Sequence, residues 1–377
     1  MDHKRLHIVS FTVPFPADYG GVIDVFHKIR HLHALGWKID LHCFTYDRPP
    51  SSELIRYTNN IHYYPRRKSP FLFFSKLPYI VISRNNEQLL DALRNDTIPV
   101  LFEGLHCTYP LLESPGIGSR SVVRTHNIEH DYYRMLADAE TSILKSAYFR
   151  SEAGKLKRYE PIVSKCHSIA AISQSDQLHF KSLNLNSELV SPFHAFDTVS
   201  IPSGCGTYSL FHGALHVAEN HRAAMWLLDK VAPKLGHELI IAGKGIQGSL
   251  RKKAETMNYV RLVENPSHEE MNGLISGAQS HLLPAFAQAG VKLKLLHALF
   301  HGRHVITNST MLKGTELHPW CILAETAEDF VREARSCHNT ALDTRFREHR
   351  QSLEQSPYSN HTNAMRLSEM LESARRG

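Results

Sequence analysis

The sequence predicts an α/β protein with two doubly wound parallel-sheet domains. The 377 residues are 42% hydrophobic, which is enough for sizeable cores and favours two domains over one. Short apolar runs of strand length alternate with helical segments in both halves of the chain, as in successive βαβ units. This alternation stops once, in a stretch with two prolines and two glycines. We therefore divide the chain into an N-terminal domain (1–190), a linker (191–206), a second domain (207–355) and a C-terminal helical segment (356–377).

The first element is an apolar run from Leu6 to Val13, which we expect to form a buried strand. A loop follows, and then a helix that Gly36 terminates. Gly20 and Gly21 occupy the turn between this strand and this helix. Because glycine has no Cβ, the backbone there allows a ligand to approach closely, and we predict that both residues face a ligand site.

Three later strands of the first domain end in polar residues. They cover residues 99–104, 121–126 and 168–173. Ligands of doubly wound sheets bind at the carboxyl ends of the strands, so these polar residues are candidates for an acceptor or cleft site. They are Glu103, His126, Asn127 and Ser173.

The second domain contains a glycine pattern that indicates a dinucleotide-binding site. Gly243-Lys-Gly-Ile-Gln-Gly248 follows a predicted strand (237–242) and opens a helix, and Glu264 lies about twenty residues further on. This spacing is that of a dinucleotide-binding turn. An NAD-dependent oxidoreductase is therefore one alternative.

Residues 280–308 form another predicted βαβ unit, with strands at 281–283 and 305–307 around a helix at 291–300. Gly290 opens this helix, and Lys292 and Lys294 lie in its first turn. The free N–H groups and positive dipole end of a helix N-terminus bind anions, and the two lysines add full charges. The unit therefore predicts a site for an anion such as a nucleotide diphosphate.

The run from Gly290 to Leu299 resembles the donor-binding segment of the family-4-like (group 1) glycosyltransferases of the GT-B fold, which share a Gly-x-Lys-Leu-Lys-Leu-Leu-Glu-Ala-Leu pattern. Thr125-His-Asn-Ile-Glu129 and Phe211–Asn220 resemble two further segments of that family. The resemblance extends over nearly the whole chain. It implies two Rossmann-like domains that face each other across a cleft, with the C-terminal helix returning to the first domain.

The resemblance implies transfer of a sugar from a UDP- or GDP-linked donor to an acceptor hydroxyl, with retention at the anomeric carbon, in glycan or polysaccharide synthesis. It implies no cofactor and no metal. His126 would lie near the sugar as the catalytic residue, and His297 would contact the ribose. The residues implied for donor binding are Gly213, Asn220, Gly243, Val263, Glu264, Gly290, Val291, Lys292, Lys294 and His297.

Four positions depart from the family pattern. Ala214 and Glu219 replace an Arg and a Lys that clamp the diphosphate, and Ala289 and His297 stand where many members have acids. These departures favour a second alternative, a catalytically degenerate GT-B protein that binds a partner or ligand without turnover.

Charge and composition limit the classes of partner that the sequence favours. The net charge of +6 is compatible with anionic partners. We expect a nucleotide-sugar donor and a glycan or lipid-linked acceptor, and no nucleic acid. Residues 63–81 mix a basic cluster with phenylalanines and prolines, which suits peripheral contact with a membrane or, alternatively, completion of the domain core.

Several further patterns concern metals and location. His27 and His31 lie one helical turn apart, and His126-x-x-Glu129-His130 matches an inverted zinc-peptidase motif, but we expect no metal at either place. Six scattered cysteines without a Cys-x-x-Cys pair indicate a reducing compartment. No apolar run approaches the roughly 18 residues of a membrane span. We expect a cytoplasmic protein, either free or at the inner face of the membrane.

Overall fold

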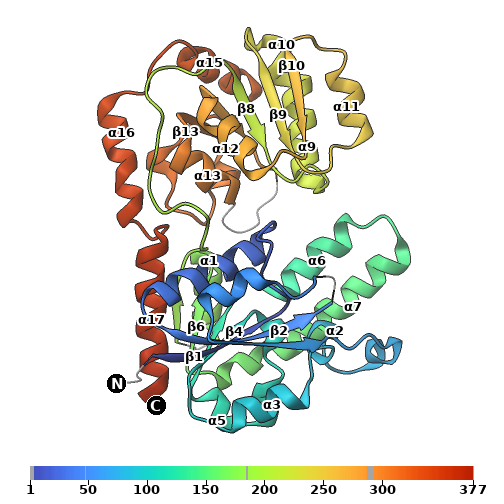
Figure 1. Ribbon diagram of the computed structural model, residues 1–377. Coiled ribbons are helices and arrows are strands. Elements are labelled where there is room, and N and C mark those ends of the chain that lie inside the picture. Colours follow the sequence, from blue (N-terminus) through green and yellow to red (C-terminus); the bar gives the residue numbers. More distant parts are fainter. Residues whose placement is uncertain (1–3, 47, 184–185, 287–292, 377) are drawn as a thin grey trace. The chain divides into compact units, whose positions relative to one another are not determined.

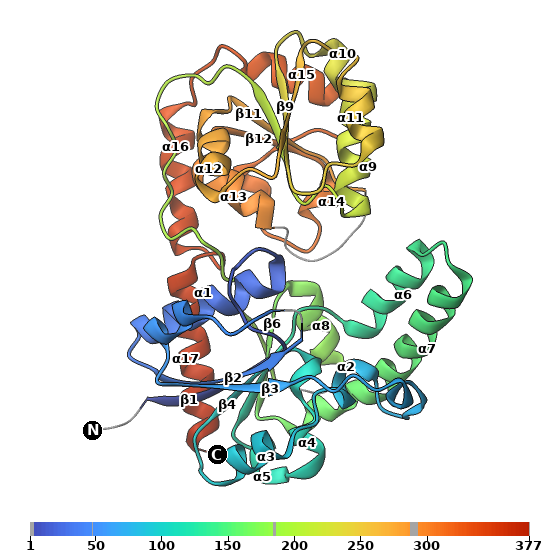
Figure 2. The same cartoon turned by 45° about the vertical axis from the view of Figure 1, so that its right-hand side comes forward.

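The computed structural model describes residues 4–46, 48–183, 186–286 and 293–376, which form two compact units. Unit 1 contains residues 1–195 and 357–377, and unit 2 contains residues 196–356. The division between Ala195 and Phe196 lies inside the predicted linker at 191–206. In each unit, helices cover both faces of one sheet (Figures 1 and 2).

Unit 1 is built on a seven-stranded sheet with the order β3-β2-β1-β4-β5-β6-β7, and every neighbouring pair is parallel. The chain thus starts in the middle, winds outward in one direction and then returns to wind in the other, which is the doubly wound topology that we predicted. The strands are β1 (Arg5–Ser10), β2 (Lys38–Thr45), β3 (Asn60–Pro65), β4 (Val100–Glu103), β5 (Ser121–Arg124), β6 (Ser168–Ala171) and β7 (Ser187–Leu189).

Helices on both faces bury the central strands of this sheet completely. The longer α-helices of unit 1 are α1 (Gly20–Ala34), α3 (Glu87–Arg94), α6 (Glu129–Ala139), α7 (Ile143–Tyr159), α8 (Gln174–Ser182) and α17 (Asn360–Arg376). Short α-helical turns are α2 (Tyr79–Ile82), α4 (Pro110–Glu113) and α5 (Pro115–Gly118). The 3-10 turns are η1 (Ser52–Tyr57), η2 (Pro70–Phe74), η3 (Leu105–Cys107) and η4 (Glu160–Lys165).

The last helix, α17, packs on α1 and belongs to unit 1 although its sequence follows unit 2. Its Leu367 and Leu371 are fully buried in the unit 1 core. The indole of Trp37 donates a hydrogen bond to Ser368 Oγ over 3.0 Å. The helix therefore closes one side of the unit 1 sheet.

Unit 2 has a six-stranded parallel sheet with the order β10-β9-β8-β11-β12-β13. Its strands are β8 (Ser209–His212), β9 (Leu239–Gly243), β10 (Val260–Glu264), β11 (Ser280–Leu283), β12 (His304–Thr307) and β13 (Ile322–Leu323). The helices are α9 (Ala218–Trp226), α10 (Ala232–Leu235), α11 (Gly248–Ala254), α12 (His268–Gly277), α13 (Leu293–His301), α14 (Ser309–Leu312), α15 (Ala327–Cys337) and α16 (Thr344–Gln351). A π-helical turn η5 (Leu227–Val231) and 3-10 turns η6 (His318–Trp320) and η7 (Ser352–Gln355) complete it.

Several strand boundaries differ from the prediction. β1 ends at Ser10 instead of Val13, β5 ends at Arg124 instead of His126, and β6 ends at Ala171 instead of Ser173. In the first case Ser10 Oγ donates to the carbonyl oxygen of Thr12, and Pro14, which has no N–H for a sheet ladder, follows. The edge strand β3 was not predicted, since most of its residues are partly or fully exposed and it lacks an apolar run.

In the part of the chain that the structure describes, no helix combines the length and the apolar character that crossing a membrane requires.

Candidate functional site

Each sheet has one place where the winding direction reverses. In unit 1 it lies between β1 and β4, and in unit 2 between β8 and β11. Loops leave the carboxyl ends of the two strands in opposite directions there, which opens a crevice for ligands in doubly wound sheets. The predicted site residues follow these strands or their neighbours, so each unit contains one candidate site.

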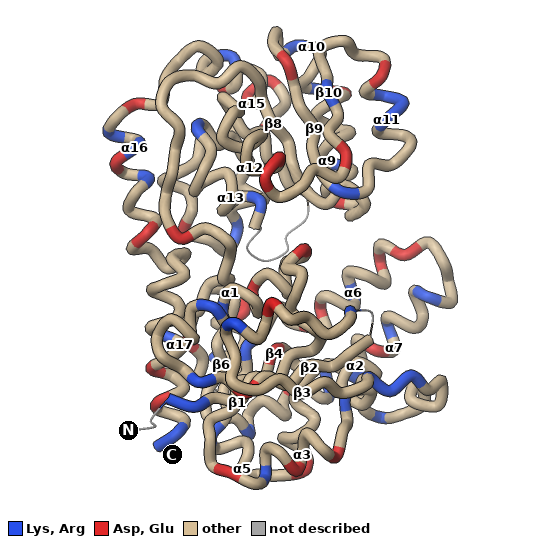
Figure 3. Tube along the Cα trace, in the orientation of Figure 1, with Lys and Arg blue, Asp and Glu red and all other residues tan. Residues whose placement is uncertain are grey.

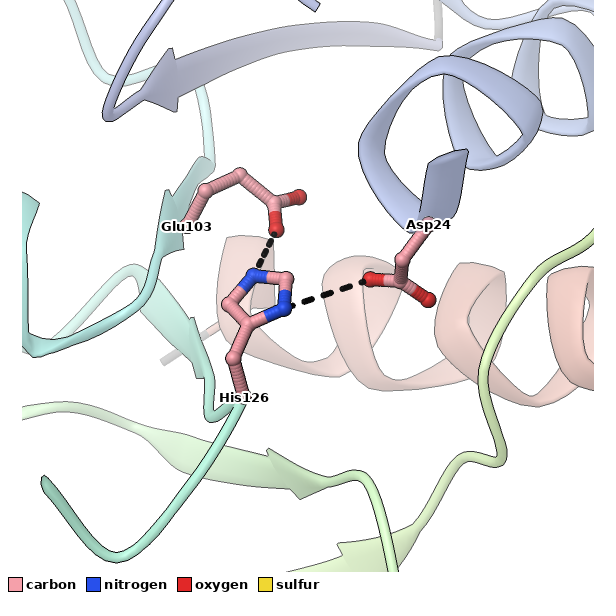
Figure 4. A group of neighbouring side chains, drawn as sticks. All are labelled: Asp24, Glu103 and His126. Atoms are coloured by element: carbon pink, nitrogen blue, oxygen red, sulfur yellow. Dashed lines mark hydrogen bonds and ion pairs between the residues drawn. The ribbon is translucent and has the colours of Figure 1, made fainter. Parts of the chain in front are cut away.

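In unit 1, His126 lies between two carboxylates (Figure 4). Its Nε2 is 3.1 Å from Glu103 Oε2, and its Nδ1 is 3.9 Å from Asp24 Oδ2. Glu103 is the last residue of β4, Asp24 lies in the second turn of α1, and His126 follows β5. Both carboxylates are buried, whereas the side chain of His126 is 10% exposed.

Two buried cations neutralise these carboxylates. Lys28 Nζ is 2.8 Å from Asp24 Oδ2 and 2.8 Å from both oxygens of Glu103. Arg124 donates to Asp24 Oδ1 over 2.9 Å, and it also donates to the carbonyl oxygen of Val190. Charges that are fully withdrawn from water require such partners, and Lys28 and Arg124 have no side-chain exposure.

The same contacts set the protonation of the two acids. Burial raises the pKa of Asp24, but the charges of Arg124 and Lys28 outweigh it and hold that pKa below its usual range. Burial also raises the pKa of Glu103, and Lys28 together with the hydrogen bond from His126 lowers it below its ordinary value. An ionised Glu103 can only accept, so the Nε2 of His126 carries the hydrogen of their bond.

This assignment leaves Nδ1 of His126 too far from Asp24 for a hydrogen bond, at 3.9 Å. The imidazole is therefore fixed in orientation by one carboxylate while its second nitrogen can serve a ligand. Asp24, Glu103 and His126 are also the group of three potential metal ligands found among the described residues. Because the Lys28 ammonium already bridges both carboxylates, the arrangement suits orientation of the imidazole better than a divalent ion.

Aromatic packing fixes the other face of His126. The ring of Phe11 lies edge-on to His126, with 5.4 Å between the ring centroids. A Cβ at Gly21 would lie 3.1 Å from Phe11, so the predicted turn glycine permits this ring position. Gly20 has open space around it. Gly21 therefore acts on the histidine through Phe11, which the sequence reasoning did not identify.

The remaining predicted residues of unit 1 have structural contacts. Asn127 lies between β5 and α6 and interacts with the Glu129 carboxyl. Ser173 caps α8, where its Oγ accepts a hydrogen bond from the Asp176 amide over 3.2 Å. Helix capping therefore accounts for Ser173.

In unit 2, Lys294 lies in the first turn of α13 and reaches the first turn of α9. Its Nζ donates to Asn220 Oδ1 over 2.7 Å and lies 4.8 Å from the ring centre of Phe211. Asn220 in turn donates to the carbonyl oxygen of Ala214, directly after Gly213. The structure thus brings the first turns of α9 and α13 together at the reversal point, where we predicted an anion site.

Gly213 and Gly243 allow the loops after β8 and β9 to approach each other closely. A Cβ at Gly243 would overlap the carbonyl oxygen of Gly213. Of the other predicted residues, Val263 packs at the end of β10, and Glu264 pairs with Arg251 over 2.6 Å at the surface. The two glycines therefore belong to the candidate site of unit 2, while Glu264 has a partner of its own.

His297, predicted to contact a ribose, is 9% exposed. Its Nε2 lies 3.0 Å from Asn272 Oδ1, and the ring of Phe196 stacks on it with centroids 4.1 Å apart. His212, the last residue of β8, lies 5.8 Å away, and burial lowers its pKa well below the ordinary value. The neutral His212, whose buried Nε2 has no hydrogen-bond partner in the described structure, was not predicted.

Four predicted positions, Ala289, Gly290, Val291 and Lys292, lie outside the described residues. The predicted helix at 291–300 is observed as α13, described from Leu293.

The two rival motifs lack their structural context. The glycines of 243–248 lie at and after the end of β9, the second strand of unit 2, whereas the dinucleotide turn follows the first strand at the reversal point. In the zinc-peptidase motif, His126 precedes α6 instead of lying on it, and His130 Nδ1 is 3.1 Å from Glu160. His126 and His130 therefore do not share a helical face.

The sequence reasoning missed Asp24, Lys28 and Arg124. A spacing of four places Asp24 and Lys28 on one helical face, but this pattern is common on solvated helices. Arg124 as the last residue of an apolar strand was the stronger signal, because a charge at a buried strand position needs a buried partner.

Comparisons with known proteins show similarity over most of the chain. Residues 206–338 match the family model described as "Glycosyl transferases group 1". An "uncharacterized 44.6 kDa protein in cps region" of Klebsiella pneumoniae is 29% identical over 334 residues, which are 82% of this chain and 84% of that protein.

Two solved structures illustrate the likeness of the fold. HepE from Anabaena, in complex with UDP and glucose, is 10% identical with a TM-score of 0.64, over 98% of this chain and 99% of that one. Sucrose-phosphate synthase from Thermosynechococcus elongatus is 15% identical with a TM-score of 0.66, over 97% and 98% of the two chains.

Proposed function

We propose, from the premise that this chain has the GT-B fold and that residues 206–338 form a group 1 glycosyltransferase domain, that it moves a sugar from a nucleotide diphosphate to an acceptor hydroxyl. The observation that carries the proposal is the contact between Lys294 and Asn220 at the reversal point of unit 2. It places a full positive charge at the carboxyl ends of β8 and β11. The matched family range covers both residues.

In the reaction that we propose, the bond between the anomeric carbon and the diphosphate oxygen breaks, and the acceptor oxygen bonds to that carbon. The acceptor proton leaves with the departing diphosphate, whose negative charge Lys294, Lys292 and the first turn of α13 stabilise. Retention at the anomeric carbon remains part of the proposal. The nucleotide sugar is a co-substrate, and neither a cofactor nor a metal takes part.

Within unit 1, the proposed role of His126 is to hold the transferred sugar. Glu103 fixes its ring, so that Nδ1 can form a hydrogen bond to a sugar hydroxyl without reorganisation during the reaction. Asp24 and Lys28 act as positioning residues, because they contact Glu103 and His126 rather than the ligand.

The acceptor is proposed to be a glycan or a lipid-linked sugar, in polysaccharide synthesis at the cytoplasmic face of a membrane. The relative from a cps region of Klebsiella pneumoniae and the UDP and glucose in the HepE structure support this assignment. No nucleic-acid partner is part of it.

Donor binding is tested by thermal shift with UDP-glucose, GDP-mannose and NAD. A ligand at 100 times its dissociation constant stabilises the folded state by about 2.7 kcal/mol, so binding raises the unfolding temperature measurably. Lys294→Met should weaken nucleotide-sugar binding at least about tenfold, because it removes a charge from the diphosphate site. The control is Lys313→Met, which removes an exposed lysine of the same unit. A shift by NAD alone would instead support the oxidoreductase.

Turnover separates the enzyme from the degenerate alternative. Slow hydrolysis of the bound donor, followed by proton NMR, should release UDP or GDP together with the sugar in the anomeric configuration of the donor. It should be unaffected by EDTA. Binding of the donor without nucleotide release on any tested acceptor would instead favour the catalytically degenerate protein. The substitutions at Ala214 and Glu219 and the packing of His297 support that alternative.

A further inference from the structure

Four large apolar side chains of unit 1 are almost fully exposed. Phe71 and Phe74 of η2 are 81% and 87% exposed, and Ile143 and Leu144 at the start of α7 are 85% and 84% exposed. The next large apolar side chain in the described part of the chain, Ile55, is 66% exposed. Exposed apolar clusters of this kind mark contact with a protein or a membrane.

Both pairs belong to one side of unit 1. Phe73, between Phe71 and Phe74 in the chain, stacks on Tyr79 at 4.6 Å and lies 5.5 Å from Tyr148 of α7. Lys155 Nζ donates to the carbonyl oxygen of Phe73 over 2.7 Å. The η2 turn is therefore attached to the helix that begins with the other pair, and both views show it on the same side as the α6–α7 turn (Figures 1 and 2).

The packing of η2 explains why its aromatics do not enter the core. Tyr64 of β3 and Ile80 and Val81 of α2 are buried in the core on either side of this segment. Phe73 is held against Tyr79 and Tyr148, so the turn presents its other rings outward. The two interpretations of residues 63–81 thus apply to different residues: the ends complete the core, and the centre is exposed.

Positive charge surrounds the exposed rings. Residues 66–76 contain Arg66, Arg67, Lys68 and Lys76 and no acidic residue (Figure 3). Arg66 and Lys68 lie 4.8 Å and 4.9 Å from the ring centre of Tyr46, and Arg66 also donates to Ser83 Oγ over 3.0 Å. These contacts hold Arg66 and Lys68 in the segment that leads into η2. The α6–α7 turn carries Asp138 and Glu140 as well as Lys145, so it supplies apolar contact without an excess of positive charge.

We infer that Phe71, Phe74, Ile143 and Leu144, with the cations of residues 66–76, form a surface that docks unit 1 onto an anionic lipid membrane. The cations fit the negative headgroups, and the four apolar side chains fit the boundary between headgroups and acyl chains. Charge complementarity favours this occupant over a second copy of the chain, whose matching surface would carry the same positive charge. The inference does not depend on sugar transfer, since docking is a property of this surface.

The test is cosedimentation of the full chain with vesicles of phosphatidylcholine and phosphatidylglycerol, and with vesicles of phosphatidylcholine alone. We expect binding to the mixed vesicles that weakens as salt is added, because salt screens the headgroup attraction. The double variants Phe71→Ser with Phe74→Ser, and Ile143→Ser with Leu144→Ser, should each lower the partition coefficient at least about tenfold. Replacing Arg67 and Lys68 by Ser should remove the preference for phosphatidylglycerol.

Ile55→Ser with Leu178→Ser is the matched control, since these side chains are 66% and 64% exposed on the same unit and lie outside the proposed surface. It should bind vesicles as the wild type does. All variants should keep the wild-type unfolding temperature and the nucleotide-sugar shift, which separates failed docking from failed donor binding. Equal vesicle binding by the wild type and the Phe71/Phe74 variant would overturn the inference. So would a wild-type dimer that this variant dissociates, because it would assign the surface to a second copy.

Discussion

Replacing Glu129 by glutamine removes an acid that the fold keeps neutral. Glu129 begins α6, is 4% exposed, and its Oε1 has no hydrogen-bond partner in the described structure. Burial raises its pKa to about 8; Arg84 opposes this effect, and Asp176 and Glu160 add to it. Glutamine has the same shape and no charge, so Glu129→Gln preserves the packing and abolishes the titration.

The direction and size of the change in stability with pH follow from the protonation of Glu129 in the folded and unfolded states. The unfolded chain releases this proton near the ordinary value of 4.5, and the folded protein releases it only near 8, so the unfolded state is increasingly favoured as pH rises between these values. From about pH 6 to about pH 8 the wild type should lose about 2 kcal/mol through this group, at 1.36 kcal/mol per pKa unit less the partial titration near 8. For a unit of this size, that is about 4 to 8 °C in unfolding temperature.

The assay is thermal unfolding of the wild type and Glu129→Gln across this pH range. The variant should lose less stability than the wild type as pH rises and should be the more stable protein at the upper end. Glu369→Gln, at an exposed position of α17, is the control and should follow the wild type. Parallel curves for wild type and Glu129→Gln, or a variant that is less stable at every pH, would refute the reasoning, because either result would mean that the folded protein holds an ionised, paired carboxylate.

Two further substitutions test the packing of the candidate sites, one in each unit. Lys28→Met should lower the free energy of unfolding, measured in urea, by about 3 to 5 kcal/mol, because it leaves the Asp24 and Glu103 charges buried without their shared cation. The control Lys181→Met, at an exposed position, should lower it little. A loss below about 1 kcal/mol for Lys28→Met would contradict the network. Gly243→Ala should destabilise unit 2 severely, because the added Cβ forces apart the loops after β8 and β9. The control Gly248→Ala should be close to neutral, since a Cβ there meets nothing within 4 Å. Equal stability of the two alanine variants would disprove the close approach of the two loops.

Local features of the chain were predictable because they depend on residues a few positions apart. Ser267 and Glu270 have the Ser-x-x-Glu spacing that is the sequence signature of a capping box, and this box is observed at the start of α12. The alternation of apolar runs with helices was sufficient for the doubly wound fold, which is confirmed. The resemblance to group 1 glycosyltransferases is confirmed as well, by the match of residues 206–338.

What the sequence could not supply are contacts between residues far apart in the chain. Asp24 and Arg124 are 100 positions apart, and their ion pair exists because the parallel sheet places the end of β5 beside α1. The same limit applies to burial: nothing in the run from Tyr63 to Val81 distinguishes Tyr64, which is buried under the sheet edge, from Phe74, which is exposed. Sequence periodicity reports the face of an element, whereas burial and charge pairing depend on what tertiary packing places against that face.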